Sequence, residues 1–175
     1  MPIERERKFL VAYGRTAGVE AIPGFQSTAK VTKGIVTGYF TKGEVDFRVF
    51  KASTYDPIAV KSTLRCKVCI KGPGEESRLE LEYDITEDEA DQLLSYSPTL
   101  LTKTRYLFGG WEIDSMLLDG MRLVVAEWEF GPGKEQLPSP LPEWIGIDIT
   151  GVKQFTNQYL AWEYGTPAAA DKEEF

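Results

Sequence analysis

The sequence contains no histidine and only two cysteines. Without histidine, Ser–His and Cys–His catalysis, histidine general bases and most zinc or iron sites are excluded. The two cysteines, Cys66 and Cys69, resemble half of a zinc site, but such a site needs about four ligands and the chain has no second pair. Positions three apart in a strand point to opposite faces, so we expect both cysteines to pack as small hydrophobic side chains. Any metal must therefore be held by carboxylates.

Long hydrophobic runs are also absent. No segment approaches the roughly 18 apolar residues that cross a membrane, and the first residues are charged where a signal peptide would be apolar. We therefore expect a cytoplasmic protein without a membrane partner. The 27 acidic and 20 basic residues give a net charge of −7, which argues against nucleic acid as a partner. The length of 175 residues predicts one domain, over residues 1–163, followed by a flexible tail at 164–175.

Most of the chain has the alternation and turn residues typical of strands. One helix is predicted after Thr86, because Glu89 completes a capping box and Ala90 and Leu94 then fall on one apolar stripe. A second helix is predicted at about 151–163 from apolar residues at helical spacing. The predicted strands are residues 2–12, 33–42, 44–52, 63–71, 77–85, 102–108, 111–117 and 120–130.

Eight antiparallel strands and two helices predict a mainly β (α+β) fold. A closed eight-stranded antiparallel β-barrel is favoured, because closure removes the edges that an open meander would expose. The helices are then expected to pack outside the barrel and at one end. Residues 15–30 are ambiguous, and the proline-rich stretch at 135–144 is predicted to be a connection.

Charged side chains share one face of most of these strands. In ERERK, residues 4–8, the alternation of an extended chain places Glu4, Glu6 and Lys8 together. Two arrangements are open: a barrel with an apolar interior and these charges outside, or a water-filled tunnel with the charges inside. The tunnel is favoured, because the opposite faces carry apolar residues that need cover. The other charged faces hold Arg48; Lys71; Arg78, Glu80 and Glu82; Lys103 and Arg105; Glu112 and Asp114; Glu127 and Glu129.

A tunnel lined by both charges suits an elongated polyanion with several phosphoryl groups. The carboxylates would repel this small-molecule ligand unless a hard divalent cation, Mg²⁺ or Mn²⁺, bridged them to it. With no histidine to act as base, a water activated by the metal is the expected nucleophile, so the predicted reaction is phosphoryl transfer to water. The cations expected to bind the phosphates are Lys8, Arg48, Lys71, Arg78, Lys103 and Arg105.

The same residues resemble a known family. Glu4-x-Glu6-x-Lys8 resembles the ExExK opening of the CYTH superfamily, the triphosphate tunnel metalloenzymes. The similarity continues in order through TGYF, FRVF, IKGPG, SRLELEYDI, TKTRY, WEID, AEWEF and EWIGIDITGVKQFTNQYLA, and so extends to about residue 161. The resemblance implies an eight-stranded tunnel that hydrolyses a triphosphate with a divalent metal, closed at one end by the helix at 151–163.

The resemblance also implies roles for individual residues. The metal would be held by Glu4, Glu6, Glu127 and Glu129, and the phosphates by the six cations named above. Glu80, Glu82 and Asp114 match further acidic positions, and with Glu4, Glu6 and Lys8 they are the predicted catalytic residues.

Three positions depart from the family pattern. Phe50 stands where an arginine is usual, which would remove one phosphate contact or change the preferred polyphosphate. Asp148 replaces a commoner glutamate, and Thr37 replaces a commoner glutamine.

The preferred activity is hydrolysis of inorganic tripolyphosphate to pyrophosphate and phosphate. The alternatives are a thiamine triphosphatase, a nucleoside triphosphatase, an adenylate cyclase, or a polyphosphate-binding domain without turnover, which only Phe50 favours. An organic substrate would need an aromatic contact, for which Trp111 or Tyr39 is available. A homodimer is left open.

Overall fold

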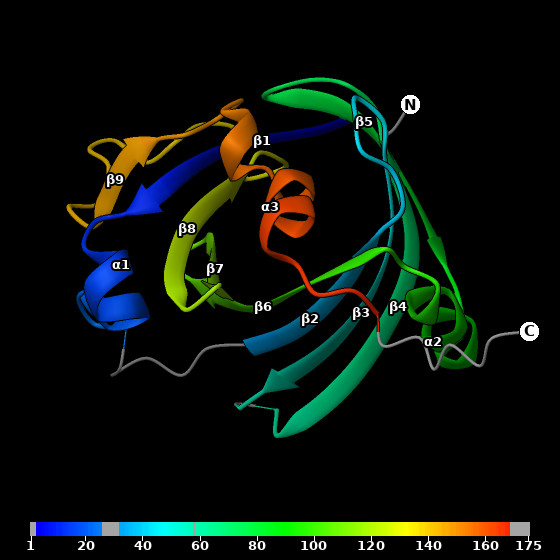
Figure 1. The fold of residues 1–175 in the computed structure, drawn as a ribbon. Helices are drawn as coiled ribbons and strands as arrows, with labels where there is room; N and C mark the ends of the chain where they lie inside the picture. The colour runs from blue at the N-terminus through cyan, green and yellow to red at the C-terminus, as the bar shows by residue number, and fades with distance from the viewer. Residues whose placement is uncertain (1–2, 26–31, 58, 169–175) are drawn as a thin grey trace, which may run out of the picture.

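The computed structural model describes residues 3–25, 32–57 and 59–168. Eight antiparallel strands form a closed barrel in the order β5-β4-β3-β2-β6-β7-β8-β1, and β5 pairs with β1 to close it (Figure 1). The predicted fold class is confirmed. The barrel strands are β1 (Ile3–Val11), β2 (Thr32–Tyr39), β3 (Asp46–Asp56), β4 (Lys61–Lys71), β5 (Ser77–Asp84), β6 (Thr99–Phe108), β7 (Trp111–Leu118) and β8 (Met121–Glu129).

The structure adds a short ninth strand, β9 (Ile145–Asp148), which the sequence analysis did not predict. It directly follows the predicted proline-rich connection at 135–144. Its position follows from the closure of the barrel. β5 pairs with β1 only as far as Arg5, and β9 then pairs with the same strand from Phe9 to Val11. The backbone groups that β5 leaves free on β1 are therefore partly satisfied by β9.

The helix predicted at 151–163 is shorter than expected. Gly151 has a positive φ of 73°, and a 3-10 helix, η2 (Lys153–Phe155), precedes the helix proper, α3 (Asn157–Tyr164). Thr156 is in an extended conformation, and its hydroxyl accepts a hydrogen bond from the backbone N–H of Tyr159. This N-cap fixes the start of α3.

The capping box predicted at Thr86 is present at the start of α2 (Glu87–Ser95). α2 lies outside the barrel (Figure 1), where Ala90 and Leu94 pack with Val49 and Cys66. Within the ambiguous segment 15–30, the structure forms two short turns of helix, α1 (Gly14–Ala17) and the 3-10 helix η1 (Gly18–Ala21). Residues 26–31 lie outside the described part of the chain.

The outer face of β1, β7 and β8 is apolar and covered, as the tunnel arrangement requires. α1, η1 and the connection before β9 supply the cover, so these segments form one core with the strands. This core comprises Phe9, Val11, Val19, Ile22, Phe25, Trp111, Ile113, Val124, Ala126, Trp128 and Trp144.

One end of the barrel interior is also apolar. There the inward faces of the strands meet α3 and close the barrel, so the prediction that the C-terminal helix closes one end agrees with the structure (Figure 1). This plug contains Tyr39, Leu101, Met116, Leu118, Val125, Ile149, Leu160 and Ala161.

The described part of the predicted tail is attached to the barrel. The backbone groups of Thr166 and Leu100 exchange hydrogen bonds of 2.7 and 3.1 Å. Residues 169–175 lie outside the described residues. Among the described helices, none has the length and apolarity needed to span a bilayer.

Candidate functional site

The charged faces of the strands converge on one cavity inside the barrel. This lumen has a volume of about 600 Å³ and is lined from β1 to β8 by side chains of alternating positions. The arrangement with charges inside, rather than the one with charges on the surface, is therefore the one the chain adopts. Of the predicted site residues, the lumen is lined by Glu4, Glu6, Arg48, Lys71, Arg78, Glu80, Glu82, Lys103, Arg105, Glu127 and Glu129.

Asp114 lies beneath the lumen surface and does not line it. Its carboxylate is fully buried and accepts hydrogen bonds from Lys103 Nζ at 2.5 Å and from Arg105 Nε at 2.6 Å. Burial alone would raise the pKa of Asp114, but Arg105 and Lys103 outweigh it and lower the pKa. Asp114 therefore positions two cations; the structure gives it no direct access to a ligand in the lumen.

Arg105 is the centre of this charged layer. Its guanidinium also pairs with Glu112 and, at 2.5 Å, with Glu127. Glu112 and Glu127 are direct cross-strand neighbours on β7 and β8, so Arg105 neutralises a pair of like charges. Burial and Arg105 together lower the pKa of Lys103.

Lys8 lines the second cavity described below rather than the lumen itself. It is buried, and its Nζ lies 2.6 Å from Glu127, which faces it across β1 and β8. Burial would lower the pKa of Lys8, but Glu127 and Glu6 raise it. Glu127, predicted as a metal ligand, is thus held by Lys8 and Arg105.

Glu4 and Glu6 are tied to cations on β4 and β5. Lys71 Nζ donates to both oxygens of Glu4 at 2.5 and 2.7 Å. Arg78 bridges the two carboxylates, at 3.0 Å from Glu4 and 3.1 Å from Glu6. The motif residues Glu4 and Glu6 therefore face the cations that are predicted to bind phosphate.

The ion pairs of Arg48 are longer than those of the other cations of the site. Its guanidinium lies 3.4 Å from Asp46 and 3.6 Å from Glu80, and its Nε atom is buried without a hydrogen-bond partner. Glu80 is also 3.0 Å from Lys71, which outweighs the effect of burial and lowers the pKa of Glu80. Glu82 pairs with Lys67 at 2.6 Å.

The two cysteines lie on opposite faces of β4, as the spacing predicts. Cys66 packs under α2, whereas the Cys69 thiol donates a hydrogen bond of 3.2 Å to Glu80. Burial raises the pKa of the Cys69 thiol to about 11, so the thiol is protonated at neutral pH. Cys69, Glu80 and Glu82 are the one group of three described residues whose ligand atoms lie within 4.8 Å of one another. A protonated thiol and two carboxylates already paired with lysines make this group a poor metal site.

Glu129 is the predicted site carboxylate without a cation. Among the described residues, it makes no ion pair, and it faces Glu6 directly across β1 and β8. Burial raises the pKa of Glu129, and the nearby Glu112, Glu4, Glu80 and Glu6 raise it further. Like charges placed opposite each other destabilise a sheet unless a cation neutralises them.

This carboxylate group fits a hard divalent cation. The ligand atoms of Glu4, Glu6 and Glu129 are all carboxylate oxygens. The charge of Glu129 is not balanced by a described cation, and Glu4 and Glu6 lie on the neighbouring strand, β1. Mg²⁺ and Mn²⁺ prefer such ligands. Of the predicted metal set, Glu129 is the carboxylate most suited to the ion, and Glu6 beside it pairs with Arg78. Glu4 and Glu127 each already pair with two cations.

The positions that depart from the family pattern have different locations. Thr37 and Phe50 face each other across β2 and β3 and both line the lumen. Asp148 lies on β9 and pairs with Arg7, away from the lumen. Trp111, considered as a stacking partner, is buried in the outer core at 2% exposure, so that suggestion is wrong; Tyr39 lines the lumen but is 1% exposed.

Several lining residues were missed from the sequence. Asp46 and Lys67 share the alternation of Arg48 and Lys71, so the same periodicity could have found them. Lys33 and Arg65 also line the lumen, and the same alternation along their strands predicts that they face inward. Asn157 lines it from α3, and no sequence signal places that helix start against the barrel.

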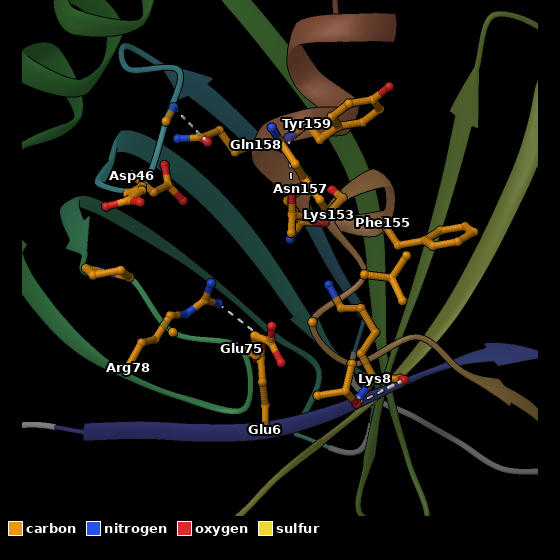
Figure 2. A pocket seen from close by; sticks show the side chains of 18 of the residues that line it. Glu6, Lys8, Asp46, Glu75, Arg78, Lys153, Phe155, Asn157, Gln158 and Tyr159 are labelled. Atoms are coloured by element: carbon orange, nitrogen blue, oxygen red, sulfur yellow. Dashed lines mark hydrogen bonds and ion pairs between the residues drawn. The ribbon is translucent and has the colours of Figure 1, made fainter.

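A second cavity, of about 580 Å³, adjoins the lumen. It lies between the connection from β4 to β5, the start of β3 and α3, and Figure 2 shows Glu6, Lys8 and Arg78 on one side and Asn157 and Gln158 on the other. Glu6, Arg48, Arg78 and Asn157 line both cavities.

The fold and the site define a closed antiparallel β-barrel whose lumen is lined by paired cations and carboxylates. No family model matches the chain. A curated relative from Acetivibrio thermocellus, named inorganic triphosphatase, is 37% identical over 90 residues, which cover 48% of this chain and 56% of the relative. The match thus spans about half the length of that relative.

Two solved structures of the protein NE1496 are similar in fold. One, described as a hypothetical protein, aligns over 92% of this chain and 99% of its own with a TM-score of 0.50 and 22% identity. The other, described as an inorganic triphosphatase, aligns over 92% and 95% with a TM-score of 0.48 and 22% identity. The first of these structures shows a shared fold, and the partial sequence match to the relative agrees with the resemblance that the motifs indicate.

Proposed function

We propose that this chain is a metal-dependent triphosphatase that hydrolyses inorganic tripolyphosphate to pyrophosphate and phosphate in the lumen. The observation that carries the proposal is the charge distribution there: cations in contact with carboxylates, and one carboxylate, Glu129, with no cation. The inorganic triphosphatase from Acetivibrio thermocellus, which shares half of its length with this chain, supports the choice of substrate.

The cations of the lumen would bind phosphate by exchange. Lys71 and Arg78 now hold Glu4 and Glu6. Phosphate oxygens offer these cations the same charge-assisted hydrogen bonds as carboxylates do. A bound triphosphate would therefore release carboxylate oxygens of Glu4 and Glu6 from their ion pairs, next to Glu129.

The released carboxylates are the proposed holders of Mg²⁺ or Mn²⁺. The ion supplies charge neutralisation for the phosphates and lowers the pKa of water. Glu129, whose charge no described cation balances, would hold the ion together with these carboxylates. Lys103 and Arg105, held in place by Asp114, would stabilise charge on the phosphoryl group.

A polyphosphate-binding domain without turnover is the second candidate. Phe50 favours it, because an apolar ring occupies part of the lumen wall. The two functions differ in their dependence on metal: binding through cations survives removal of the metal, whereas hydrolysis does not.

The test is a comparison of substrates and products. Tripolyphosphate, thiamine triphosphate and ATP are incubated with the full chain and Mg²⁺ or Mn²⁺, and the products are separated. We expect pyrophosphate and phosphate, with tripolyphosphate turned over fastest. Formation of cyclic AMP from ATP would show that the chain is a cyclase and not a hydrolase. Binding of a triphosphate without any product would favour the polyphosphate-binding domain.

A further inference from the structure

Two of the cations that line the lumen have no carboxylate partner. They are Lys33 on β2 and Arg65 on β4, and among the residues that the structure describes the side chain of neither makes an ion pair or a hydrogen bond. Both can therefore bind an anion without displacing a carboxylate. The other six cations of the lumen each pair with a carboxylate; these are Arg48, Lys67, Lys71, Arg78, Lys103 and Arg105.

Lys33 and Arg65 lie at the end of the lumen opposite α3. Lys33 comes well before Tyr39, the residue of β2 that packs in the plug under α3, and the two lie about 20 Å apart along the strand. Arg65 lies on the part of β4 nearest to the β3–β4 turn, which extends away from α3 (Figure 1). Arg65 is exposed and Lys33 is half-buried. A ligand that enters the lumen from this end therefore reaches both side chains first.

Two threonines lie between these cations. Lys33 faces Thr54 across β2 and β3, and Thr54 faces Thr63 across β3 and β4. Both threonines line the lumen, and Arg65 follows Thr63 on the same face of β4. The backbones at Lys33 and Arg65 are about 12 Å apart, from the usual spacing and rise of strands. On the concave inner face of a barrel, two long side chains can meet around one anion at this separation.

The charges around this group have one sign. Lys33 is the direct cross-strand neighbour of Arg105, and Arg65 lies next to Lys67 on the same face of β4. Like charges in these positions repel each other unless a counter-ion lies between them. Lysine and arginine offer only hydrogen-bond donors, and each threonine hydroxyl adds one more. The ligand that this group suits is therefore an anion rich in acceptor oxygens, such as a phosphoryl group.

The deeper cations are less available to an incoming anion. Lys71 and Arg78 pair with Glu4 and Glu6, so a phosphoryl group must replace carboxylate oxygens to reach them. Without Lys33 and Arg65, the lumen would be lined by seven carboxylates and six cations. Such a surface repels a polyanion in the absence of metal, because the carboxylates are in excess.

We propose that Lys33, Arg65, Thr54 and Thr63 form an entry site for the polyanion at this end of the lumen. Its ligand is one phosphoryl group, which binds there without metal and before the deeper cations exchange their carboxylates for phosphate oxygens. The phosphoryl group belongs either to the incoming triphosphate or to free phosphate. The identity of the polyanion rests on the proposed function, whereas binding at the entry site needs neither metal nor turnover.

The test is equilibrium binding of tripolyphosphate and of inorganic phosphate to the full chain in EDTA, measured by calorimetry at several salt concentrations. The variant is the double substitution Lys33→Gln with Arg65→Gln. Loss of two charge-assisted contacts should weaken tripolyphosphate binding at least about tenfold at low salt. The dependence of the affinity on salt should also become shallower. A loss confined to tripolyphosphate assigns the site to the end of the polyanion, and a similar loss for phosphate shows that the site also holds the free ion.

Two further double variants separate a site from a general effect of charge. Arg15→Gln with Arg122→Gln removes the same two charges from exposed positions on α1 and β8 that line neither cavity, and should leave the affinity nearly unchanged. Lys33→Arg with Arg65→Lys keeps both charges and should retain most of the affinity. Because neither Lys33 nor Arg65 has a carboxylate partner, their removal leaves no carboxylate unpaired and should not lower the melting temperature.

No binding of tripolyphosphate to the wild-type chain in EDTA would overturn the proposal. Unchanged affinity in Lys33→Gln with Arg65→Gln would do the same, as would an equal loss in the double variant of Arg15 and Arg122. Phosphate release from tripolyphosphate in Mg²⁺, measured separately, tests the proposed function alone. An inactive chain whose binding of tripolyphosphate depends on Lys33 and Arg65 retains the entry site, and an active chain whose binding does not depend on them lacks it.

Discussion

At the scale of single residues, Glu129 shows how a binding site opposes stability. Its raised pKa means that the folded state binds a proton more readily than the unfolded state does. The contribution of Glu129 to the free energy of unfolding therefore falls as pH rises above the ordinary value of 4.5, and it is unfavourable at neutral pH.

Glu129→Gln should therefore raise the melting temperature of the metal-free protein at pH 7, while removing metal-dependent turnover. A charge this accessible to solvent contributes under ~1 kcal/mol, so the expected rise is about 1–2 °C. Thermal unfolding in EDTA and phosphate release in Mg²⁺ measure the two effects. Glu143→Gln, at an exposed glutamate outside both cavities, is the control. A lower melting temperature, or full metal-dependent activity, would show that Glu129 is not the uncompensated ligand.

Asp114 is the opposite case, because its buried carboxylate is paired with two cations, Lys103 and Arg105. Asp114→Asn would leave Lys103 and Arg105 buried with one partner fewer. Breaking a buried ion pair in this way costs about 3–5 kcal/mol. Urea unfolding should show this loss, whereas Asp119→Asn, in an exposed turn with a positive φ of 48° that asparagine tolerates, should change stability little. Equal midpoints for Asp114→Asn and the wild type would contradict the role of Asp114 as a structural anchor.

At the scale of elements, α2 is stabilised by its cap and is separate from the lumen. Thr86 Oγ1 accepts from the backbone N–H of Glu89 at 3.3 Å, and the Glu89 carboxylate accepts from the Thr86 backbone at 2.8 Å. Thr86→Ala should destabilise the protein by about 1 kcal/mol without changing kcat or KM for tripolyphosphate, because α2 packs on the outside of β3 and β4.

Ser95→Ala, at the other end of the same helix, is the matched control in urea unfolding. An altered KM in Thr86→Ala would indicate that α2 communicates with the lumen after all.

The elements also show what sequence patterns can and cannot predict. Alternation along a strand is a local property, and it correctly grouped Glu4 with Glu6 and Lys103 with Arg105 in the lumen. The same rule placed Trp111 opposite to Glu112, and hence outside, although Trp111 was considered as a substrate contact. β9 and the late start of α3 depend on which backbone groups other elements leave free, which alternation does not contain.

The sequence predicted the site about as well as it predicted the strands and helices. Which charged residues face inward follows from periodicity, but which carboxylate remains unpaired depends on cross-strand register. Glu129 and Glu127 are two positions apart on one strand; the register gives Glu127 two cations and places Glu129 opposite Glu6. The second cavity depends on α3 folding back against the turn before β3, where Gln158 bonds to Gly43, 115 residues earlier in the chain.

At the scale of the whole molecule, closure of the barrel brings the charged faces of all the strands around one lumen. With a net charge of −7, the chain attracts a polyanion only where its cations are concentrated, and the closed sheet gathers them around one lumen. The apolar plug under α3 closes one end, while α1, η1 and the segment before β9 cover the outer apolar face.

The central claim, that the lumen is a metal-dependent triphosphatase site, is tested most directly by phosphate release from tripolyphosphate before and after removal of divalent metal. The account predicts release in Mg²⁺ or Mn²⁺, its loss in EDTA, and its recovery when an excess of the metal is added back. Equal release in EDTA, or no release with either metal, would contradict it.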